Sequence, residues 1–426
     1  MNILMLTNSY TPHISGVEKS ILSFTEIFRE KGHNVKIIAP ETDLPVNDDK
    51  DVMRVTAVKN FNHTEYPVGI PMPGEVDDLI DEFKPDIVHS HFPFFIGSTA
   101  IRIAAARDIP IVFTYHTMYE RYIHYISCES DRVRNFVRML ASGYCNLCDM
   151  VIAPSTGVKN ILAGRGVKTP IEVIPTGIKV AQFAKPSGTG MRGRFKIPDN
   201  AFTAGYTGRF TTEKNLEFLA EAISIVLAQK QDAYFMMVGD GPLKETLEDF
   251  FESKGLTKRV VFTGKLQGGD LVDAYHCMNV FTFTSQTETQ GMVLAEAMAA
   301  GVPVVAIKGP GITDIVKDGF NGFMTDTDIA AQFAEKVIEC YDCDKDKWQQ
   351  LKKNAVDTAA DFSIEKCADA LLEKYNEVIN RTSPHVKDPA LWTTAADLIK
   401  TEWDIFHNYL NALAEMLLPL DRKEEE

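Results

Sequence analysis

The chain has 426 residues, of which 45% are hydrophobic, 24% charged and 10% aromatic. Single domains usually have ~100 to 200 residues, so this length predicts about two or three domains, and the composition is that of a globular protein. The 59 Asp and Glu outnumber the 44 Lys and Arg and give a net charge of -15. Such a charge disfavours non-specific attraction to nucleic acid. We therefore expect an enzyme that acts on small molecules, without a nucleic-acid partner.

The apolar segments are too short to cross a membrane. The longest, such as residues 301–307, fall far below the ~20 residues that a membrane-spanning helix needs. Residues 1–10 lack the basic patch and the cleavage site of a secretory signal, and they are predicted to form a buried strand. These features predict a cytoplasmic protein.

Seven cysteines include two Cys-x-x-Cys pairs, Cys145 with Cys148 and Cys340 with Cys343. A structural zinc site normally needs two such pairs close together, whereas these lie far apart in the sequence. We expect reduced thiols, with metal or redox use as the less favoured alternative.

Short apolar runs alternate with helical periodicity from the start of the chain. A strand is predicted over residues 2–7, a helix over 17–31 and a second strand over 35–39, which together form a βαβ unit. Further runs are rich in Val, Ile and Phe, as is typical of strands that are buried on both faces. They are residues 87–90, 111–115 and 150–153. The first half of the chain is thus predicted to be a parallel α/β domain.

Residues 185–193 are rich in glycine and turn-forming residues and show no periodicity, so a linker is expected there. A second alternating series then follows, with helices at 216–227 and 292–300 and strands at 202–207, 233–238, 260–262, 280–283 and 304–307. Two Rossmann-like domains are predicted. Because ligands bind beyond the carboxyl ends of parallel strands, we expect the functional residues in loops there, lining a cleft between the domains.

The loop after the predicted strand 202–207 carries two cations, Arg209 and Lys214. Placed at the end of a strand, they could bind a diphosphate through charge-assisted hydrogen bonds, each contributing roughly 1.5 to 3 kcal/mol. The alternative is a solvated helix start with an incidental Arg and Lys.

A second loop contains Glu288, Gly291 and Glu296. If the whole segment were helical, the two carboxylates would point in different directions. A helix that begins near Gly291 instead directs the amides of Gly291 and Met292 at an anion and places Glu296 about one turn into the helix. One carboxylate could then reach a sugar and the other a ribose. The alternative is a capped amphipathic helix with two surface acids.

Other loops offer weaker signals. Gly16 opens a helix after the first strand, so a phosphate could approach its backbone closely. Gly239 and Gly264 end two later strands, and with Lys265 and Leu266 they could frame a base or form simple turns.

Three histidines follow predicted strands of the first domain. His116 could donate a hydrogen bond to a substrate hydroxyl and change its charge near neutral pH. His89 is interpreted as structural, and His91 is left open between the two roles.

Together, the loop from Gly208 to Asn215, Gly239 with its neighbours, and Glu288 followed by Glu296 resemble the family 4 retaining glycosyltransferases of GT-B fold. The resemblance covers roughly residues 1–380. Together with the composition, it predicts an acceptor-side domain, a linker, a nucleotide-sugar donor domain and a helix that crosses back, followed by a helical extension that goes beyond what the family fold needs. Their predicted bounds are 1–178, 179–200, 201–362, 363–382 and 383–426.

The resemblance also implies roles for individual residues. The donor diphosphate would be bound by Gly16, Arg209 and Lys214, the ribose by Glu296, and the base by the segment from Gly264 to Leu266. The transferred sugar would be held by Glu288, Thr289, Gln290 and Gly291. His116 would contact this sugar near its reacting carbon. Neither a metal nor a cofactor is implied, so the acidic pairs Asp326 with Asp328 and Asp344 with Asp346 are interpreted as solvated turns.

Within the family, the segment that follows His116 and the one that follows Glu288 are similar to bacterial diacylglycerol glucosyltransferases. This implies transfer of a hexose to a membrane lipid. Glucose from UDP-glucose is the favoured donor, and the sequence leaves GDP-mannose and other donors open. Two departures are Arg121, where that group often has an acid, and Ser15, which replaces the first glycine of a common pair. Transfer to a soluble sugar, a polysaccharide or phosphatidylinositol, a non-catalytic nucleotide-sugar-binding role and a GT-B isomerase are the alternatives.

A lipid acceptor requires contact with a membrane, and a helix over residues 131–144 is the candidate surface. Arg132, Arg134 and Arg138 accompany its apolar face, and basic amphipathic helices bind anionic lipid. We expect a peripheral protein on the cytoplasmic face of the cell membrane. The alternative is a helix that faces the core and has solvated arginines.

The last segment has apolar residues at alternating steps of three and four, typical of a packed helical seam. They are Trp403, Phe406, Leu410, Leu413 and Leu417. Because acidic residues surround them, packing on the body of the protein or on a second copy in a homodimer is favoured over membrane binding.

Overall fold

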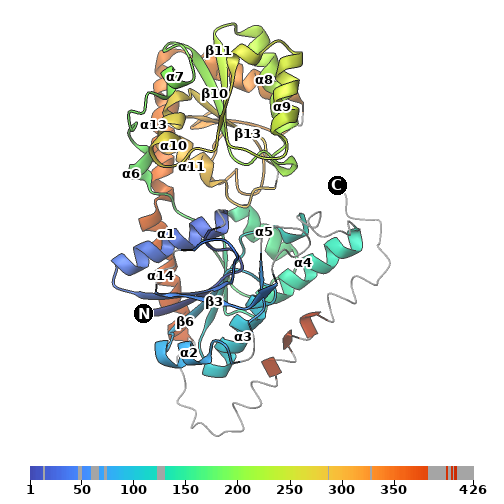
Figure 1. The fold of residues 1–426 in the computed structure, drawn as a ribbon, viewed down its shortest axis with the longest axis vertical. Helices are drawn as coiled ribbons and strands as arrows, with labels where there is room; N and C mark the ends of the chain where they lie inside the picture. The colour runs from blue at the N-terminus through green and yellow to red at the C-terminus, as the bar shows by residue number, and fades with distance from the viewer. Residues whose placement is uncertain are drawn as a thin grey trace. The chain divides into compact units, whose positions relative to one another are not determined.

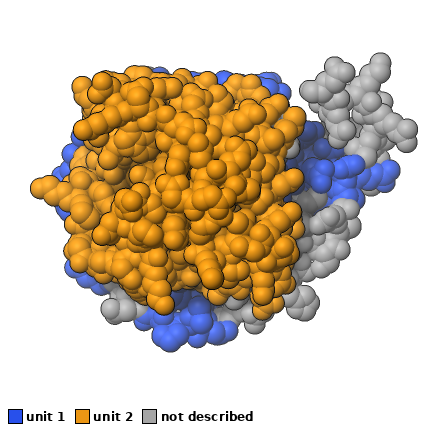
Figure 2. Space-filling view, turned by 90° about the horizontal axis from the view of Figure 1, so that it is seen from above, with its two compact units in different colours: residues 1–154, 158–174, 367–426 blue, residues 155–157, 175–366 orange. Residues whose placement is uncertain are grey.

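The structure is a computed structural model that describes most of the chain. The described residues are 1–12, 15–46, 50–58, 67–71, 74–121, 130–285, 287–326, 329–381, 400–401, 404–405 and 407–409. The chain forms two compact units, coloured blue and orange in Figure 2. Unit 1 comprises residues 1–154, 158–174 and 367–426, and unit 2 comprises residues 155–157 and 175–366.

Unit 1 contains a seven-stranded parallel sheet in the order β3-β2-β1-β6-β7-β8-β9. Every residue of β6, β7 and β8 is buried, because helices cover both faces of the sheet (Figure 1). The strands are β1 (Asn2–Leu6), β2 (Asn34–Pro40), β3 (Val52–Val55), β6 (Ile87–Ser90), β7 (Ile111–Thr114), β8 (Met150–Ala153) and β9 (Ile171–Val173). A separate antiparallel pair is formed by β4 (Ala57–Val58) and β5 (Val68–Gly69). The helices are α1 (Gly16–Glu30), α2 (Asp77–Phe83), α3 (Ile96–Arg107), η2 (Tyr119–Arg121), α4 (Asp131–Cys145), most of α5 (Thr156–Gly164), and α14 (Ile364–Arg381) from Cys367 onward.

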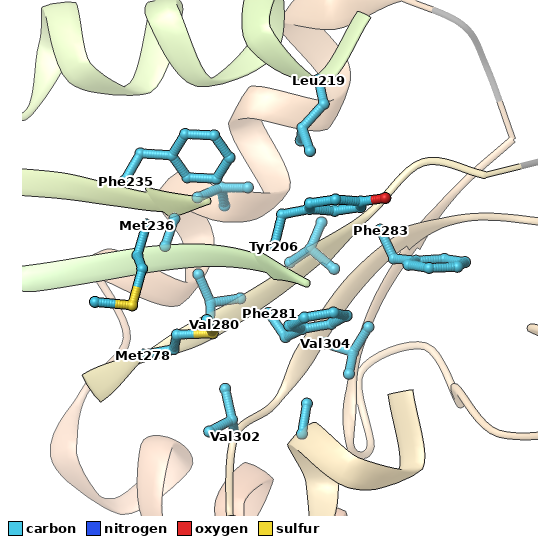
Figure 3. Packing of buried hydrophobic residues seen from close by; sticks show 14 of the residues in the cluster. Tyr206, Leu219, Phe235, Met236, Met278, Val280, Phe281, Phe283, Val302 and Val304 are labelled. Carbon is cyan, nitrogen blue, oxygen red and sulfur yellow. The ribbon is translucent and has the colours of Figure 1, made fainter. Parts of the chain in front are cut away.

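Unit 2 contains a six-stranded parallel sheet in the order β12-β11-β10-β13-β14-β15. Large apolar side chains of its central strands, among them Tyr206, Phe235 and Phe281, are fully buried around the sheet (Figure 3). The strands are β10 (Phe202–Thr207), β11 (Ala233–Val238), β12 (Val260–Gly264), β13 (Val280–Phe283), β14 (Val304–Ile307) and β15 (Gly322–Thr325). The helices are α6 (Val180–Phe183), α7 (Met191–Arg194), η4 (Thr212–Lys214), α8 (Leu216–Gln229), α9 (Lys244–Ser253), η5 (Thr257–Arg259), α10 (Gly268–Cys277), α11 (Met292–Ala299), α12 (Ala330–Tyr341), α13 (Lys345–Ala359) and η6 (Ala360–Phe362). The prediction of two Rossmann-like parallel-sheet domains is confirmed.

Each sheet has one point where the strand order reverses. In unit 2 the chain runs outward from β10 to β11 and β12, and then returns to build β13, β14 and β15 on the other side of β10. In unit 1 the same reversal lies between β1 and β6. Loops on the two sides of such a point diverge and leave a crevice at the carboxyl ends of the strands, which is where ligands bind in open parallel sheets. The predicted site residues lie at or beyond the ends of β10, β11, β12 and β13 in unit 2, and of β1, β6 and β7 in unit 1.

The chain passes from unit 1 to unit 2 after residue 174, whereas the sequence predicted a linker over 179–200. Residues 179–200 belong to unit 2, since Met191 and Ile197 are buried in its core. The Asp273 carboxylate of α10 also accepts hydrogen bonds from the backbone amides of Ser187 and Thr189. Glycine-rich composition predicted a linker here, but these long-range contacts hold the segment in unit 2.

The helix predicted over 363–382 corresponds to α14 (Ile364–Arg381). The chain re-enters unit 1 at Cys367, and the α14 side chains of Leu371, Tyr375 and Val378 are buried. The predicted domain bounds therefore differ from the two units mainly at the first crossing.

The C-terminal seam predicted from Trp403, Phe406, Leu410, Leu413 and Leu417 lies outside the described residues. Within the described part, Ile405 is buried in the unit 1 core, and the Asn408 side chain donates a 3.2 Å hydrogen bond to the Leu140 carbonyl oxygen of α4. No helix among the described residues is long and apolar enough to cross a bilayer.

Candidate active site

The loop after β10 and the loop after β13 are joined at the reversal point of unit 2. The Thr284 hydroxyl donates to the backbone carbonyl of Lys214 at 3.0 Å, and the Ser285 hydroxyl donates to that of Glu213 at 3.3 Å. These bonds hold η4 against the end of β13. The loop that carries the two predicted cations therefore has a defined position beside the Glu288 loop.

An ion pair connects the two loops: Lys214 Nζ lies 2.7 Å from Glu288 Oε2. The side chains are 15% and 24% exposed, so the pair is partly shielded from water. Arg209, in the same loop as Lys214, has a side chain that is 52% exposed, and its Nη2 atom lies 3.6 Å from Glu213 Oε1. The fold thus brings Lys214 and Glu288 together and leaves the Arg209 guanidinium accessible to a ligand.

The helix start predicted at Gly291 is confirmed. Gly291 has φ 78 and ψ 54 and is the N-cap of α11, which begins at Met292. A glycine suits this left-handed conformation, and an added Cβ would come within 2.9 Å of Leu294 Cδ1. The first amide groups of α11 carry the positive end of the helix dipole, which favours an anion.

Glu296 lies one turn into α11, as predicted, and is 8% exposed. Its Oε2 atom accepts a 2.7 Å hydrogen bond from the hydroxyl of Tyr275 on α10. Burial and the neighbouring Glu296 charge raise the pKa of Tyr275 well above its usual value, so the phenol stays protonated and donates. Tyr275 was missed at the sequence level, because no local motif distinguishes it among the 13 tyrosines of the chain.

Gln290 and Thr289, predicted to hold the sugar, make contacts with the segment around the first crossing. The Gln290 side chain accepts a 2.7 Å hydrogen bond from the Thr176 amide and donates a 2.6 Å bond to the Thr176 carbonyl. The Thr289 carbonyl accepts a 2.7 Å bond from the Ser155 hydroxyl. The Gln290 side chain therefore fixes the loop, and its contact with the sugar stays a prediction.

Gly239, which follows β11, and Gly264, the last residue of β12, lie beside each other. The Gly239 amide donates to the Gly264 carbonyl at 3.0 Å. A Cβ at Gly239 would come 1.9 Å from the Gly208 carbonyl oxygen, so only glycine allows this approach to the Arg209 loop. After Gly264, Lys265 is exposed and Leu266 is half-buried against the core. These positions suit the predicted contact with a base.

In unit 1, Gly16 is exposed at the first position of α1. Ser15 is its N-cap: the Ser15 hydroxyl accepts from the Glu18 amide, and Glu18 Oε2 accepts from the Ser15 amide, both at 3.1 Å. Ser15, which replaces the first glycine of the common pair, therefore forms a capping box with Glu18 that stabilises the start of α1.

Three histidines are clustered at the ends of β6 and β7: His89 lies in β6, His91 follows it, and His116 follows β7. His89 is bonded on both ring nitrogens, to the Tyr375 hydroxyl and, at 2.7 Å, to the Thr114 hydroxyl, which agrees with a structural role. His91 Nδ1 lies 2.9 Å from His116 Nε2. The fold therefore places His91, whose role the sequence left open, in contact with the predicted site residue His116.

Burial sets the charge of this cluster. It lowers the pKa of His116 to about 3 and that of His91 well below the ordinary value. Both rings are neutral at pH 7, in contrast to the predicted change of charge near neutrality. Neutral imidazole still offers one donor and one acceptor to a ligand.

The four arginine candidates lie in two places of unit 1. Arg121 ends η2, next to residues outside the described part. Arg132 and Arg134 are exposed on α4 and Arg138 is half-buried, while the opposite face of the helix is buried in the unit 1 core. The apolar face of α4 therefore packs inward, as in the alternative raised from the sequence, and contact with a membrane would be electrostatic.

The four cysteines of the two Cys-x-x-Cys pairs are free thiols, as expected. Burial raises the pKa of Cys145 to about 12 and that of Cys148 well above its usual value. Over the described ranges, no group of three or more His, Cys, Asp or Glu is arranged to hold a metal ion.

Two parallel-sheet units, with cations and a helix start at the reversal point of unit 2, define the class of GT-B glycosyltransferases. Residues 14–182 match the family model described as Glycosyltransferase Family 4, and residues 190–358 match that described as Glycosyl transferases group 1. The chain belongs to the family 4 glycosyltransferases.

The relatives differ in the sugar that their names specify. The chain is 30% identical to the alpha-monoglucosyldiacylglycerol synthase of Streptococcus pneumoniae over 79% of this chain and 78% of the relative. It is 29% identical to the GDP-mannose-dependent alpha-mannosyltransferase of Mycolicibacterium smegmatis over 77% and 85% of the two chains. The crystal structure of Anabaena HepE with UDP-glucose has a TM-score of 0.69 at 21% identity, covering 88% of this chain and 100% of that chain, and supports the fold.

Proposed function

We propose that this glycosyltransferase is a retaining, metal-independent enzyme that moves glucose from UDP-glucose to a hydroxyl group of membrane diacylglycerol. The observation that carries the proposal is the Lys214–Glu288 ion pair beside the start of α11, with Arg209 in the same loop. This arrangement offers positive charge for a diphosphate and a carboxylate for sugar hydroxyls. The 30% identity to a synthase named for monoglucosyldiacylglycerol supports the choice of sugar and acceptor.

The chemistry requires stabilisation of two opposite charges. When the bond between the anomeric carbon and the phosphate oxygen breaks, the sugar becomes positive and the diphosphate gains negative charge. Arg209, Lys214 and the first amides of α11 would stabilise the diphosphate, and Glu288 would bind the sugar hydroxyls. Each such group contributes a few kcal/mol, a substantial part of the ~8 to 23 kcal/mol by which enzymes lower barriers.

Retention follows if the acceptor attacks from the face that the diphosphate leaves. The acceptor oxygen then forms the new bond to the anomeric carbon, and its proton passes to an oxygen of the departing phosphate. The proposed reaction needs neither a redox cofactor nor a metal, because Arg209 and Lys214 would supply the countercharge. His116, which is neutral, would hydrogen-bond to the sugar near this carbon.

A lipid acceptor requires the enzyme to bind at a membrane surface. The exposed Arg132 and Arg134 and the half-buried Arg138 support electrostatic binding of α4 to anionic lipid on the cytoplasmic face. The field of these arginines acts locally, within a Debye length of ~8 Å, so the net charge of -15 does not oppose it. A homodimer through residues 383–426 remains a prediction.

A mannosyl donor is the second candidate, supported by the 29% identity to a GDP-mannose-dependent enzyme. A panel of UDP-glucose, UDP-galactose and GDP-mannose distinguishes the donors, first by thermal shift and then by transfer to diacylglycerol in vesicles or to soluble sugars. We expect UDP-glucose to stabilise the protein and to label diacylglycerol. Transfer to soluble sugars alone would contradict the lipid acceptor.

Two further results would contradict transferase activity itself. Binding of a nucleotide sugar without transfer to any acceptor, with no difference between the wild type and Glu288→Gln, would favour a protein that binds nucleotide sugars without catalysis. Conversion of the nucleotide sugar to an isomer without any acceptor would favour an isomerase, because a transferase should give only slow hydrolysis.

A further inference from the structure

Tyr275 has a fixed position between two helices of unit 2. It is fully buried on α10, and its ring lies edge-on to Phe183 at 5.8 Å between centroids and in a tilted contact with Phe281, also at 5.8 Å. Packing on these two rings determines where the phenol oxygen lies. That oxygen is the donor of the 2.7 Å hydrogen bond to Glu296 Oε2.

The Glu296 carboxylate depends on this bond. Burial of a carboxylate is costly unless the group is hydrogen-bonded, and Glu296 is 8% exposed. No second side chain among the described residues donates a hydrogen bond to it. The Tyr275 hydroxyl therefore stabilises the buried charge and restricts the rotation of the carboxylate about its last torsion angle.

The two helices joined by this bond follow different loops of the nucleotide site. Helix α10 comes after the Gly264–Leu266 loop, assigned above to the base, and α11 comes after the Glu288 loop, assigned to the sugar. The ribose of a nucleotide lies between its base and its diphosphate. The Glu296 carboxylate belongs to α11 and is fixed by the Tyr275 hydroxyl of α10. It is therefore suited to bind ribose hydroxyls at a fixed angle.

We propose that Tyr275 is a positioning residue that orients Glu296 toward the ribose of the donor nucleotide. The inference rests on the proposed function, in which Glu296 binds that ribose. Tyr275 itself does not touch the nucleotide, and its effect passes through one oxygen of Glu296 while the other oxygen meets the ribose. Its contribution is therefore specific for ribose hydroxyls.

Tyr275→Phe tests the inference because it keeps the buried ring and removes only the hydroxyl. The probes are UDP, 2′-deoxy-UDP and 3′-deoxy-UDP with the guanosine counterparts, and Kd is measured by calorimetry on the full chain. In the wild type we expect loss of one ribose hydroxyl to weaken binding about tenfold, the range of one hydrogen bond to a charged group. In Tyr275→Phe we expect the complete nucleotide to bind about tenfold more weakly and the ratio to the deoxy nucleotide to fall toward one.

Tyr341→Phe is the matched control, since the Tyr341 hydroxyl also donates to a carboxylate, Asp232 Oδ1, at 2.7 Å in unit 2. That bond is exposed, and the variant should keep the wild-type ratio between nucleotide and deoxynucleotide. If Tyr275→Phe also lowers the melting temperature, the ratio of the two Kd values still tests the inference. A general loss of stability would weaken the binding of nucleotide and deoxynucleotide equally. A wild-type ratio in Tyr275→Phe overturns the inference.

Glu296→Gln separates the inference from the proposed function. If this variant loses ribose selectivity while Tyr275→Phe keeps it, only the role of Tyr275 is wrong. If Glu296→Gln itself keeps full selectivity, the assignment of Glu296 to the ribose is wrong, and both the inference and that part of the proposed site fall together.

Discussion

Lys214 Nζ lies 2.7 Å from Glu288 Oε2, although the two residues are 74 positions apart in the chain. One was assigned to the diphosphate and the other to the sugar of the same donor. The ion pair orients both side chains at the reversal point between β10 and β13. It also predicts that each residue depends on the other for its position.

Lys214→Gln should lower kcat/KM by about 100-fold or more, because it removes the countercharge of the leaving diphosphate and leaves the Glu288 carboxylate without its cation. Steady-state kinetics measures this change. Lys230→Gln is the matched control, since Lys230 also forms an ion pair in unit 2, with Asp342. Equal losses in the two variants would assign Lys214 to stability and not to catalysis.

Gly291→Ala should reduce the free energy of UDP binding by more than it reduces the free energy of unfolding. The left-handed conformation costs a non-glycine residue roughly 1 to 2 kcal/mol, and the added methyl meets Leu294. Gly255→Ala, also at positive φ but with open space around it, should lose similar stability and keep the wild-type Kd for UDP. Unchanged Kd in Gly291→Ala would exclude the start of α11 from the site.

The buried histidines should make unit 1 less stable at acid pH. The pKa of His89 is about 3 in the folded protein, against an ordinary value near 6.5, so the unfolded chain binds more protons between these values. The stabilising contribution is complete above pH ~6.5 and is lost as the pH falls toward 3. His89→Asn should flatten this dependence of the unfolding free energy, measured by urea titration at several pH values. The same slope in the variant would contradict the assignment.

His91→Asn and His91→Phe should differ in activity. His91 Nδ1 lies 2.9 Å from His116 Nε2, and an asparagine amide can replace the imidazole Nδ1 as a hydrogen-bonding group, whereas phenylalanine cannot. We expect kcat of His91→Phe to fall at least tenfold and that of His91→Asn to be partly restored. Equal activity of the two variants would show that the bond to His116 has no part in catalysis.

Substitution of all three α4 arginines by alanine should weaken binding to anionic vesicles about 100-fold, since each basic residue near such a surface contributes ~1 kcal/mol. They are Arg132, Arg134 and Arg138. Vesicle co-sedimentation at two salt concentrations measures the effect. The control removes the same charge from exposed lysines of unit 2, namely Lys254, Lys345 and Lys353. Equal binding of both variants would remove α4 from the membrane contact.

Treatment with excess EDTA should leave the transfer rate within about twofold, because protein cations would neutralise the diphosphate. The rate is followed by labelled product in the lipid phase. Loss of activity that added Mg²⁺ or Mn²⁺ restores would contradict the metal-independent mechanism.

The alternation of strands and helices, and the start of α11 at Gly291, followed from the sequence alone. Strands buried on both faces require continuous apolar runs, and a glycine before a helix marks a left-handed cap, so both signals lie within a few neighbouring residues. The same local reasoning placed Arg209 and Lys214 in one loop after a strand.

Only the tertiary structure decided which distant residues meet. The Lys214–Glu288 and Tyr275–Glu296 pairs arise because the strand order reverses at β10, and an apolar pattern does not specify strand order. Residues 179–200 likewise belong to unit 2 through Asp273, which the sequence could not reveal. Hydrophobic periodicity determines which face of an element is buried, whereas the partners of buried polar groups depend on how whole elements are arranged in the sheet.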